Sequence, residues 1–331
     1  MYWRYVIILA VIMGIIVALI PHIIWFITLI IGKIAGFRVH YAAFGWTALA
    51  LVGIVWSLLA YGHFVGMWRS EVNEVTYASA DVPKGFDDYR IVHISDLHVD
   101  TFDERPEALK AIVDRINKLD ADVILFTGDM QSVGMQAVCN HASTLQQLHA
   151  RDGVKSVLGN HDFFLYDLDL KSDAQRCAAA DTLAQYESDH LGWHVLRNTS
   201  ERLYRNGDSI AIAGVDNING NQGFATIQKG DLKKALQGTE GLFTILLSHD
   251  PSHWRAEVLP ESDVQITLSG HTHAAQIRLF GKSLAQVSFN ECDGRYDHDG
   301  RMLYVNAGIG CTAPFRINCP SEITVITLKH Q

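Results

Sequence analysis

Five short segments of this chain combine aspartate, asparagine and histidine, which are side chains that bind hard or borderline divalent metals. In chain order they are Asp96-Leu97-His98, Gly128-Asp129, Gly159-Asn160-His161-Asp162, His249 and Gly270-His271-Thr272-His273. The set contains carboxylates, imidazoles and an amide oxygen but no thiolate, so it suits Mn, Fe or Zn better than a structural cysteine site. The residue types therefore predict a metal centre with enough ligands for two ions.

Each segment follows a short apolar run of the kind that predicts a buried strand. These runs cover residues 89–95, 123–127, 154–158, 243–248 and 264–269. Ligands of α/β sheets bind beyond the carboxyl ends of the strands. Residues i and i+2 of an extended chain point to the same side, so Asp96 with His98, or His271 with His273, can aim two side chains at one site. One such pair occurs often by chance, but five segments in order at strand ends predict a single pocket.

The five segments resemble the metal-binding motifs of the calcineurin-like metallophosphoesterase superfamily, and the resemblance covers nearly all of the chain after residue 86. The tail is similar to that of the superfamily's membrane-anchored bacterial branch, through V-N-A-G-I-G at 305–310, P-F-R-I-N-C-P at 314–320 and E-I-T at 322–324. The resemblance implies an α/β fold of four layers, in which two mixed β-sheets pack face to face with helices outside.

The resemblance also implies a role for each motif residue. One metal would be held by Asp96, His98 and His273, the second by Asn160, His249 and His271, and Asp129 would bridge the two. The implied reaction is hydrolysis of a phosphate ester by a hydroxide that bridges the metals. His161 would not bind metal but would donate a proton or a hydrogen bond to the leaving group.

Two positions depart from the family pattern. Many relatives carry Asp or His three residues after the bridging aspartate, where it orients the catalytic histidine, and this chain has Ser132. Many members of the branch have Gly-Gly after the last motif, where this chain has Ala274-Ala275. The first departure leaves open how His161 is held. The second reduces the space near the pocket and could alter the choice of substrate.

Four further residues are candidates around the pocket. Asp162 and Asp250 are expected to orient ligating or catalytic imidazoles. His253 is expected either to line the pocket or to stand at the start of a helix near Ser252. Arg316 is the only basic residue of the Gly-rich tail loop and could meet a substrate phosphate. No Gly-x-Ser-x-Gly motif occurs and no cysteine lies in the motifs, which argues against a serine or cysteine nucleophile.

The N-terminal part has the composition of a membrane anchor. Residues 5–32 and 39–68 contain no Lys, Arg, Asp or Glu, and both stretches exceed the ~20 residues that cross a bilayer as a helix. The first is too long for a cleaved signal peptide. We predict an anchor over residues 1–70 with two spans, about 5–32 and 41–67. A bend at Pro21 and His22 would instead leave one span and a membrane-embedded hairpin.

The expected location is the bacterial inner membrane, as a multi-pass protein. Lys33 and Arg38 lie between the predicted spans and Arg4 and Arg69 flank them, so the charge asymmetry that sets orientation is nearly absent. The resemblance to the anchored branch implies a catalytic domain that faces outward.

Residues 71–331 are long enough for one catalytic domain with its own core. The chain carries a net charge of −9, and subtracting the charge of +4 on the first 70 residues leaves about −13 on this domain. Such an acidic domain lacks the basic surface of a nucleic-acid binder, which argues against nucleic acid as the main substrate. Cys311 and Cys319 could pair in an oxidising compartment or remain buried thiols.

Three functions fit the sequence. The first is a membrane-anchored hydrolase of a phosphodiester or pyrophosphate bond, acting on a lipid-linked or cell-envelope substrate next to the bilayer. The second is an anchored phosphomonoesterase, including a protein phosphatase. The third is a non-catalytic metal-binding membrane protein. The complete set of ligands favours an enzyme over the third.

Overall fold

The computed structural model describes residues 2–219 and 227–331 and divides the chain into two compact units. The first consists of Met1–Trp68 with Ala313–Asn318, and the second of Arg69–Thr312 with Cys319–Gln331. The division after Trp68 lies close to the boundary predicted at residue 70. The sequence did not indicate that a short tail segment, Ala313–Asn318, belongs to the helical unit.

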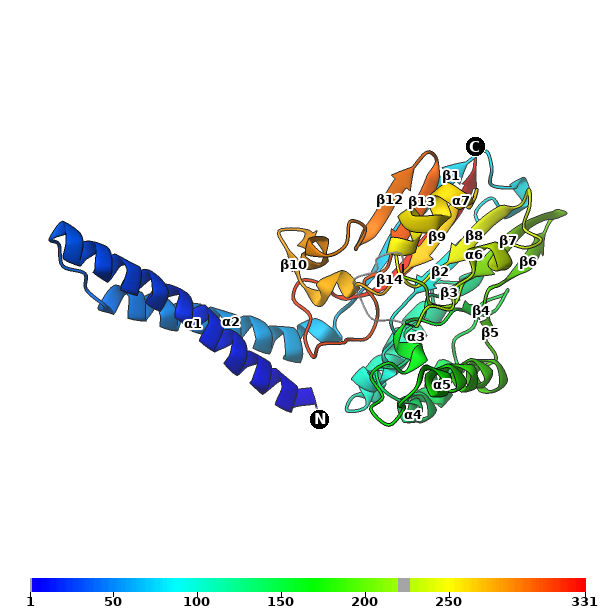
Figure 1. Ribbon diagram of the computed structural model, residues 1–331. Coiled ribbons are helices and arrows are strands. Elements are labelled where there is room, and N and C mark those ends of the chain that lie inside the picture. The colour runs from blue at the N-terminus through cyan, green and yellow to red at the C-terminus, as the bar shows by residue number, and fades with distance from the viewer. Residues whose placement is uncertain (1, 220–226) are drawn as a thin grey trace. The chain divides into compact units, whose positions relative to one another are not determined.

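The first unit contains two long apolar helices, α1 (Tyr2–Ala35) and α2 (Ala42–Phe64), which lie side by side (Figure 1). Each has an apolar window long enough to cross a membrane, and 11% of each window is buried in the protein, so neither is the core helix of a globular domain. The indole N–H of Trp56 donates to the carbonyl of Ala10 at 2.8 Å and links the two helices. Helix α1 continues through Pro21, so the structure has two long helices and not the alternative bend.

The tail segment Ala313–Asn318 packs on the end of α2. The backbone N–H of Arg316 donates to the carbonyl of Gly62 at 3.1 Å, and His63 Nδ1 lies 2.8 Å from the carbonyl of Pro314. A Cβ atom at Gly66 would overlap the carbonyl of Arg316, so a glycine is required for this close approach. The C-terminal end of α2 and the tail therefore form one packed structure.

The second unit is built on two six-stranded mixed sheets. The first sheet has the order β1 (Ser70–Ser79), β14 (Ser321–His330), β2 (Arg90–Ile94), β3 (Val123–Phe126), β4 (Val154–Ser156) and β5 (His194–Val195). The second has the order β12 (Gly294–His298), β13 (Arg301–Val305), β9 (Ile266–Ser269), β8 (Phe243–Leu247), β7 (Asp208–Gly214) and β6 (Thr199–Arg205). Strands β2, β3 and β4 are parallel, as are β7, β8 and β9, so their carboxyl ends meet at one edge.

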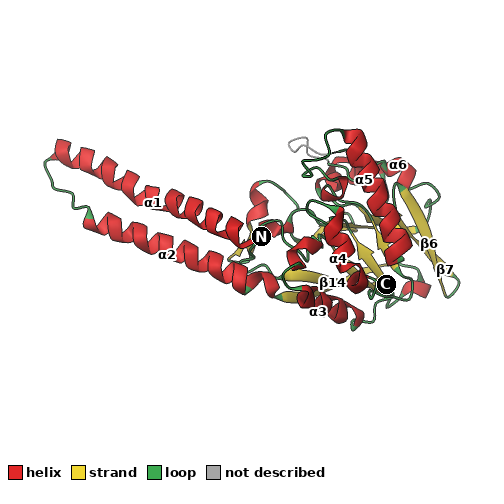
Figure 2. Ribbon diagram, turned by 90° about the horizontal axis from the view of Figure 1, so that it is seen from below, coloured by secondary structure: helices red, strands yellow, loops and turns green. Residues whose placement is uncertain are grey.

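The inner faces of the two sheets form the main core. Ile91 and Leu125 of the first sheet belong to the same buried apolar cluster as Ile212 and Ile245 of the second. Helices α3 (Pro106–Asn117), α4 (Met135–Leu145) and α5 (Asp173–Tyr186) lie together on the outside of the first sheet, as Figure 2 shows. The short helices α6 (Leu232–Ala235) and α7 (Leu259–Glu261) lie beside the second sheet. The predicted four-layer α/β fold is therefore confirmed.

Local sequence explains where the outer helices begin and which face they bury. Helix α3 starts with Pro106 in its first turn, where the missing N–H costs nothing, and buries Leu109, Ile112 and Val113. Helix α5 starts at a capping box made by Ser172 and Gln175.

Cys311 and Cys319 are buried thiols that form no disulfide in the described chain.

Candidate metal centre

The seven predicted ligands all follow the carboxyl ends of neighbouring strands. The first sheet supplies Asp96 and His98 after β2, Asp129 after β3 and Asn160 after β4. The second sheet supplies His249 after β8 and His271 and His273 after β9. Because the two sheets pack face to face, the two groups meet at one edge of the sandwich.

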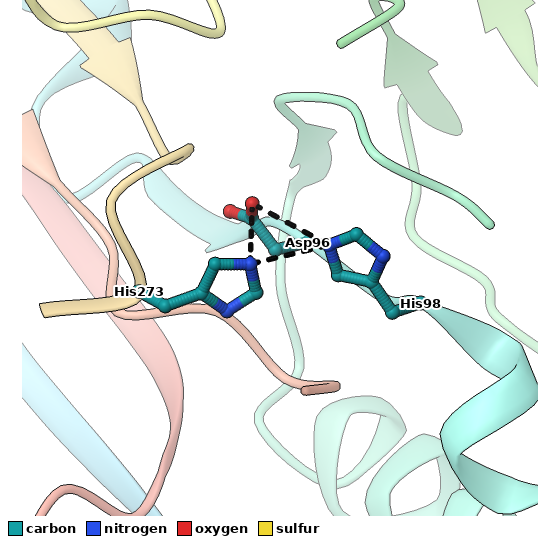
Figure 3. Close-up of side chains that lie close together, drawn as sticks. All are labelled: Asp96, His98 and His273. Atoms are coloured by element: carbon teal, nitrogen blue, oxygen red, sulfur yellow. Dashed lines mark hydrogen bonds and ion pairs between the residues drawn. The ribbon is translucent and has the colours of Figure 1, made fainter. Parts of the chain in front are cut away.

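Three of these side chains form one group, which Figure 3 shows. His273 Nε2 lies 3.2 Å from Asp96 Oδ1 and 3.1 Å from His98 Nε2. His98 Nε2 lies 4.0 Å from the same Asp96 oxygen. Two ligand atoms bound to one metal at about 2.0–2.1 Å lie roughly 3 Å from each other. The group therefore has the donors and the spacing to hold one ion.

A second group lies beside the first. Asn160 Oδ1 is 2.7 Å from His271 Nδ1 and 3.1 Å from His249 Nε2. Asp129 Oδ2 is 3.2 Å from His249 Nε2 and 3.6 Å from His98 Nε2, so it lies between the two groups. The division of these ligands between two ions, with Asp129 bridging them, stays a prediction.

The backbone at the ligands is strained. Asp96, His98, Asp129, His271 and His273 have positive φ angles of 50°, 35°, 60°, 72° and 49°. Residues other than glycine rarely adopt this region, at a cost on the order of 1 kcal/mol each. These residues turn the chain sharply after β2, β3 and β9, so that side chains from these strands point at one place.

Two motif glycines are required because the ligand loops pass so close to each other. A Cβ atom at Gly159 would overlap the carboxylate of Asp129, and one at Gly270 would overlap the side chains of Ser95 and Asp96. The glycines that precede Asn160 and His271 are therefore explained by packing. Six of the seven candidate ligands are buried, and His271 is the partly exposed one, so the site opens on its side.

Electrostatics favour an ionised Asp129. Burial acts to raise the pKa of this carboxyl, but the charges of His249, His161 and His98 and the hydrogen bond from His249 together outweigh burial and hold its pKa well below the usual range. Burial acts to lower the pKa of His249, while the carboxylate of Asp129 raises that pKa to about 10. A carboxylate that lies between two positively charged imidazoles in this way is suited to contact two cations. Bound metal ions would then replace the protons of these imidazoles.

His161 lies next to the ligands, with its ring centroid 4.7 Å from that of His98. Its Nδ1 is 2.9 Å from the main-chain carbonyl of Ser132. A carbonyl oxygen can only accept, so Nδ1 carries a hydrogen and Nε2 remains for a substrate. The main chain at Ser132 thus does what an Asp or His side chain does in many relatives, and the Ser132 hydroxyl lies 3.1 Å from His98 Nδ1.

Tyr166 was not identified from the sequence, because it belongs to no motif. Its ring lies 4.5 Å from the ring of His161, centroid to centroid, and the residue is 53% exposed. It therefore covers the face of His161 at the rim of the site.

The two predicted orienting aspartates have different contacts. Asp162 accepts hydrogen bonds from the backbone N–H groups of Asp129, Met130 and Gly159 at 2.7, 2.9 and 2.9 Å. It therefore fixes the backbone of two ligand loops and not an imidazole, which corrects the prediction. Asp250 Oδ2 lies 3.6 Å from His271 Nε2, and its orienting role for this ligand stays a prediction.

His253 and Arg316 do not reach an open pocket in the described structure. His253 is buried, and its ring nitrogens lie 2.8 Å from Ser248 Oγ and 2.9 Å from Glu257 Oε2, so it has the helix-start role and does not line the pocket. Arg316 is fully buried in the tail segment that packs on α2 and offers no surface to a substrate. For His253 the structure thus favours the helix-start alternative, and for Arg316 the predicted substrate contact is corrected, because both side chains are buried among protein groups.

The model of the calcineurin-like phosphoesterase family matches residues 89–275. The chain belongs to this family. It is 31% identical over 278 residues to the metallophosphoesterase YkuE of Bacillus subtilis, covering 81% of this chain and 89% of YkuE. It is 30% identical over 297 residues to a transmembrane protein with a metallophosphoesterase domain from Danio rerio, covering 87% of this chain and 64% of that protein.

A third relative is the UDP-2,3-diacylglucosamine pyrophosphatase LpxG of Chlamydia trachomatis serovar D, with 29% identity over 332 residues, 85% of this chain and 98% of LpxG. Family membership and the site together make this protein a metal-dependent phosphoric ester hydrolase. The family depends on two metal ions, and the chain has candidate residues to hold them.

Proposed function

We propose that this protein is a membrane-anchored phosphoesterase that hydrolyses a phosphodiester or pyrophosphate bond with the help of two divalent ions, Mn, Fe or Zn. The observation that carries the proposal is the convergence of two ligand groups on Asp129, whose Oδ2 lies within 3.6 Å of an imidazole nitrogen of each. Asp96, His98 and His273 would hold one ion, and Asn160, His249 and His271 the other, with Asp129 contacting both.

Once bound, the ions would supply a nucleophile from water at neutral pH and neutralise charge on the phosphoryl group. The protein supplies orientation and proton transfer. The bond between His161 Nδ1 and Ser132 fixes the ring so that Nε2 faces the departing oxygen, to which it donates a hydrogen bond or a proton. Tyr166 limits the directions from which a leaving group approaches that ring.

The substrate we propose is amphipathic, either a lipid-linked or a cell-envelope phosphate compound. Two observations support this class. LpxG, a relative over most of both chains, is named as a pyrophosphatase of a diacylated sugar nucleotide. The helices α1 and α2 are long and apolar enough to anchor the site at a bilayer. An anchored enzyme meets a membrane-bound substrate at a high effective concentration.

A paired assay of the full-length protein tests the reaction. We expect metal-loaded protein to hydrolyse bis(p-nitrophenyl) phosphate with a higher kcat/KM than p-nitrophenyl phosphate. A preference for the monoester would favour the anchored phosphomonoesterase or protein phosphatase. Bound metal without turnover of either compound would favour a non-catalytic binding protein.

We also propose that the protein lies in the bacterial inner membrane as a multi-pass protein whose catalytic domain faces outward. Cys139 on α4 is exposed and provides the test. A membrane-impermeant maleimide should label it in intact spheroplasts, with the Cys139→Ser variant as control. Labelling after lysis alone would place the domain inside.

A further inference from the structure

A small hairpin after the last metal motif exposes a concentration of apolar side chains. Strands β10 (Arg278–Leu279) and β11 (Lys282–Ser283) pair through a turn at Phe280 and Gly281, and a helical turn, Leu284–Val287, follows. We call residues 278–287 the apolar hairpin. Leu279, Phe280, Leu284 and Val287 are 43%, 104%, 42% and 89% exposed. An exposed apolar cluster of this kind marks an interaction surface.

The concentration is specific to this segment. In the described part of the second unit, the other large apolar side chains that are exposed lie apart from the hairpin in the sequence, at Val133, Tyr166, Leu168 and Tyr204. Of the exposed large apolar residues in the described part of this unit, half therefore lie between 279 and 287. Lys282 is exposed in the same hairpin and adds a positive charge.

The base of the hairpin pairs with a residue at the start of the second unit. Arg278 Nη1 lies 3.0 Å from Glu71 Oε1, and Arg278 also pairs with Asp293 at 2.7 Å. Glu71 is the second residue of β1, three residues after Trp68, where the helical unit ends. The connection from Phe64 to Ser70 is short, and each residue spans at most about 3.6 Å. A bilayer that contains α2 is therefore within a short reach of Glu71.

Both ends of the hairpin lead to metal ligands. Its first strand begins five residues after His273. Beyond its last residue, the ring of Phe289 lies edge-on to the ring of His271, with centroids 5.6 Å apart. A cavity of about 370 Å³, lined in part by Ser252, Arg255 and Phe289, lies at this end. A surface that holds the hairpin would therefore lie close to the metal centre.

We propose that the apolar hairpin inserts into the interface of the lipid bilayer and docks the metal centre against the membrane surface. The occupant is a lipid surface because the chain carries two apolar helices, and the hairpin pairs through Arg278 with Glu71, which follows the helical unit in the sequence by three residues. Phenylalanine and leucine enter the headgroup boundary, and Lys282 is attracted by anionic headgroups. The proposal rests on the membrane anchoring in the proposed function and not on the identity of the substrate.

A fluorescence measurement on the full chain tests the insertion directly. A polarity-sensitive NBD label is placed at Phe280→Cys in a Cys139→Ser, Cys177→Ser background, in which Cys292, Cys311 and Cys319 remain buried. The protein is reconstituted into vesicles of phosphatidylcholine and phosphatidylglycerol. The matched control is a label at Tyr204→Cys on β6, a residue that is 75% exposed.

We expect the label at 280 to shift to shorter emission wavelength and to be quenched by lipids that carry a nitroxide near the headgroup. The label at 204 should show neither effect. Equal emission and equal quenching at the two positions would overturn the proposal.

An activity measurement separates this proposal from the proposed function. The measured quantity is the ratio of two rates, hydrolysis of a lipid pyrophosphate in vesicles over hydrolysis of a soluble chromogenic diester. In the Phe280→Ser, Val287→Ser variant this ratio should fall on the order of tenfold. Tyr204→Ser should leave this ratio unchanged, and an unchanged ratio in the hairpin variant would contradict the docking role. Absence of diester hydrolysis in the wild type would refute the proposed diesterase function, while the label at 280 would still decide whether the hairpin inserts.

Discussion

The His161→Ala substitution tests the division of labour in the site. The structure places His161 beside the ligand groups, where its backbone N–H donates to Asp129 Oδ1 at 2.8 Å. Alanine keeps this backbone bond and removes the ring that Ser132 orients. We therefore expect metal content near that of the wild type and a loss of proton donation to the leaving group.

The size of the loss follows from the role of the ring. General acid catalysis contributes about 10²–10⁴-fold, which is roughly 2.7–5.5 kcal/mol of the activation free energy. A leaving group that is a poor anion needs the proton most. The loss in kcat should thus be on the order of 10²-fold or more with an alkyl phosphodiester and smaller with a p-nitrophenyl diester, whose phenolate departs as a stable anion.

Two measurements check this prediction. Elemental analysis gives the metal content of the variant, and steady-state kinetics with diesters of increasing leaving-group pKa give the dependence on the leaving group. Loss of metal with unchanged turnover per bound metal pair would refute the role of His161. An equal loss of kcat with every leaving group would refute proton donation.

Three further predictions concern the bridging ligand, the serine behind the histidines and a buried acid. Wild-type protein should bind close to two equivalents of divalent metal, and Asp129→Ala should lose most of both; one tightly bound ion unaffected by the substitution would contradict the bridging position. Ser132→Ala removes the hydroxyl next to His98 but keeps the carbonyl next to His161, so metal affinity should fall by about 10–100-fold while kcat at saturating metal stays near wild type. Glu187 is fully buried, and its pKa is raised to about 8, mainly by burial and next by the charge of Asp162. The folded state therefore holds the Glu187 proton more tightly than the unfolded state. The free energy of unfolding should thus decrease as pH rises from about 4.5 to 8. Glu187→Gln should keep the contact with Ser156. At pH 8.5 its free energy of unfolding should exceed that of the wild type by on the order of 4 kcal/mol, and the difference should be smaller at pH 5. Unfolding curves that show the same difference at both pH values would contradict the assignment.

The sequence by itself determined the identity of the candidate ligands, because their signal is local. Asp96 and His98, like His271 and His273, are two residues apart directly after apolar runs, from which we predicted an extended chain with both side chains on one side. The structure instead has positive φ angles at these four residues, so the chain turns there, and the same side chains still converge. The two apolar helices are equally local, since their length and lack of charge can be counted. The layered α/β fold followed from family resemblance on the same motifs.

The tertiary structure decided what holds these residues in place. Every residue has a carbonyl, so nothing in the sequence shows that the one at Ser132 meets His161. The sequence indicated Asp162 as a group that orients others. It could not show that the three donors to Asp162 are backbone N–H groups of loops that fold back onto it.

The same holds for residues whose environment depends on distant parts of the chain. Arg316 was predicted to face a substrate, yet its segment packs on Gly62, more than 250 positions away, and its side chain is buried. Phe280 is a large apolar residue of a type usually buried, yet it is 104% exposed. The physical reason is that composition and spacing determine a residue's type and its local direction, whereas burial and partners depend on which remote segments pack against it.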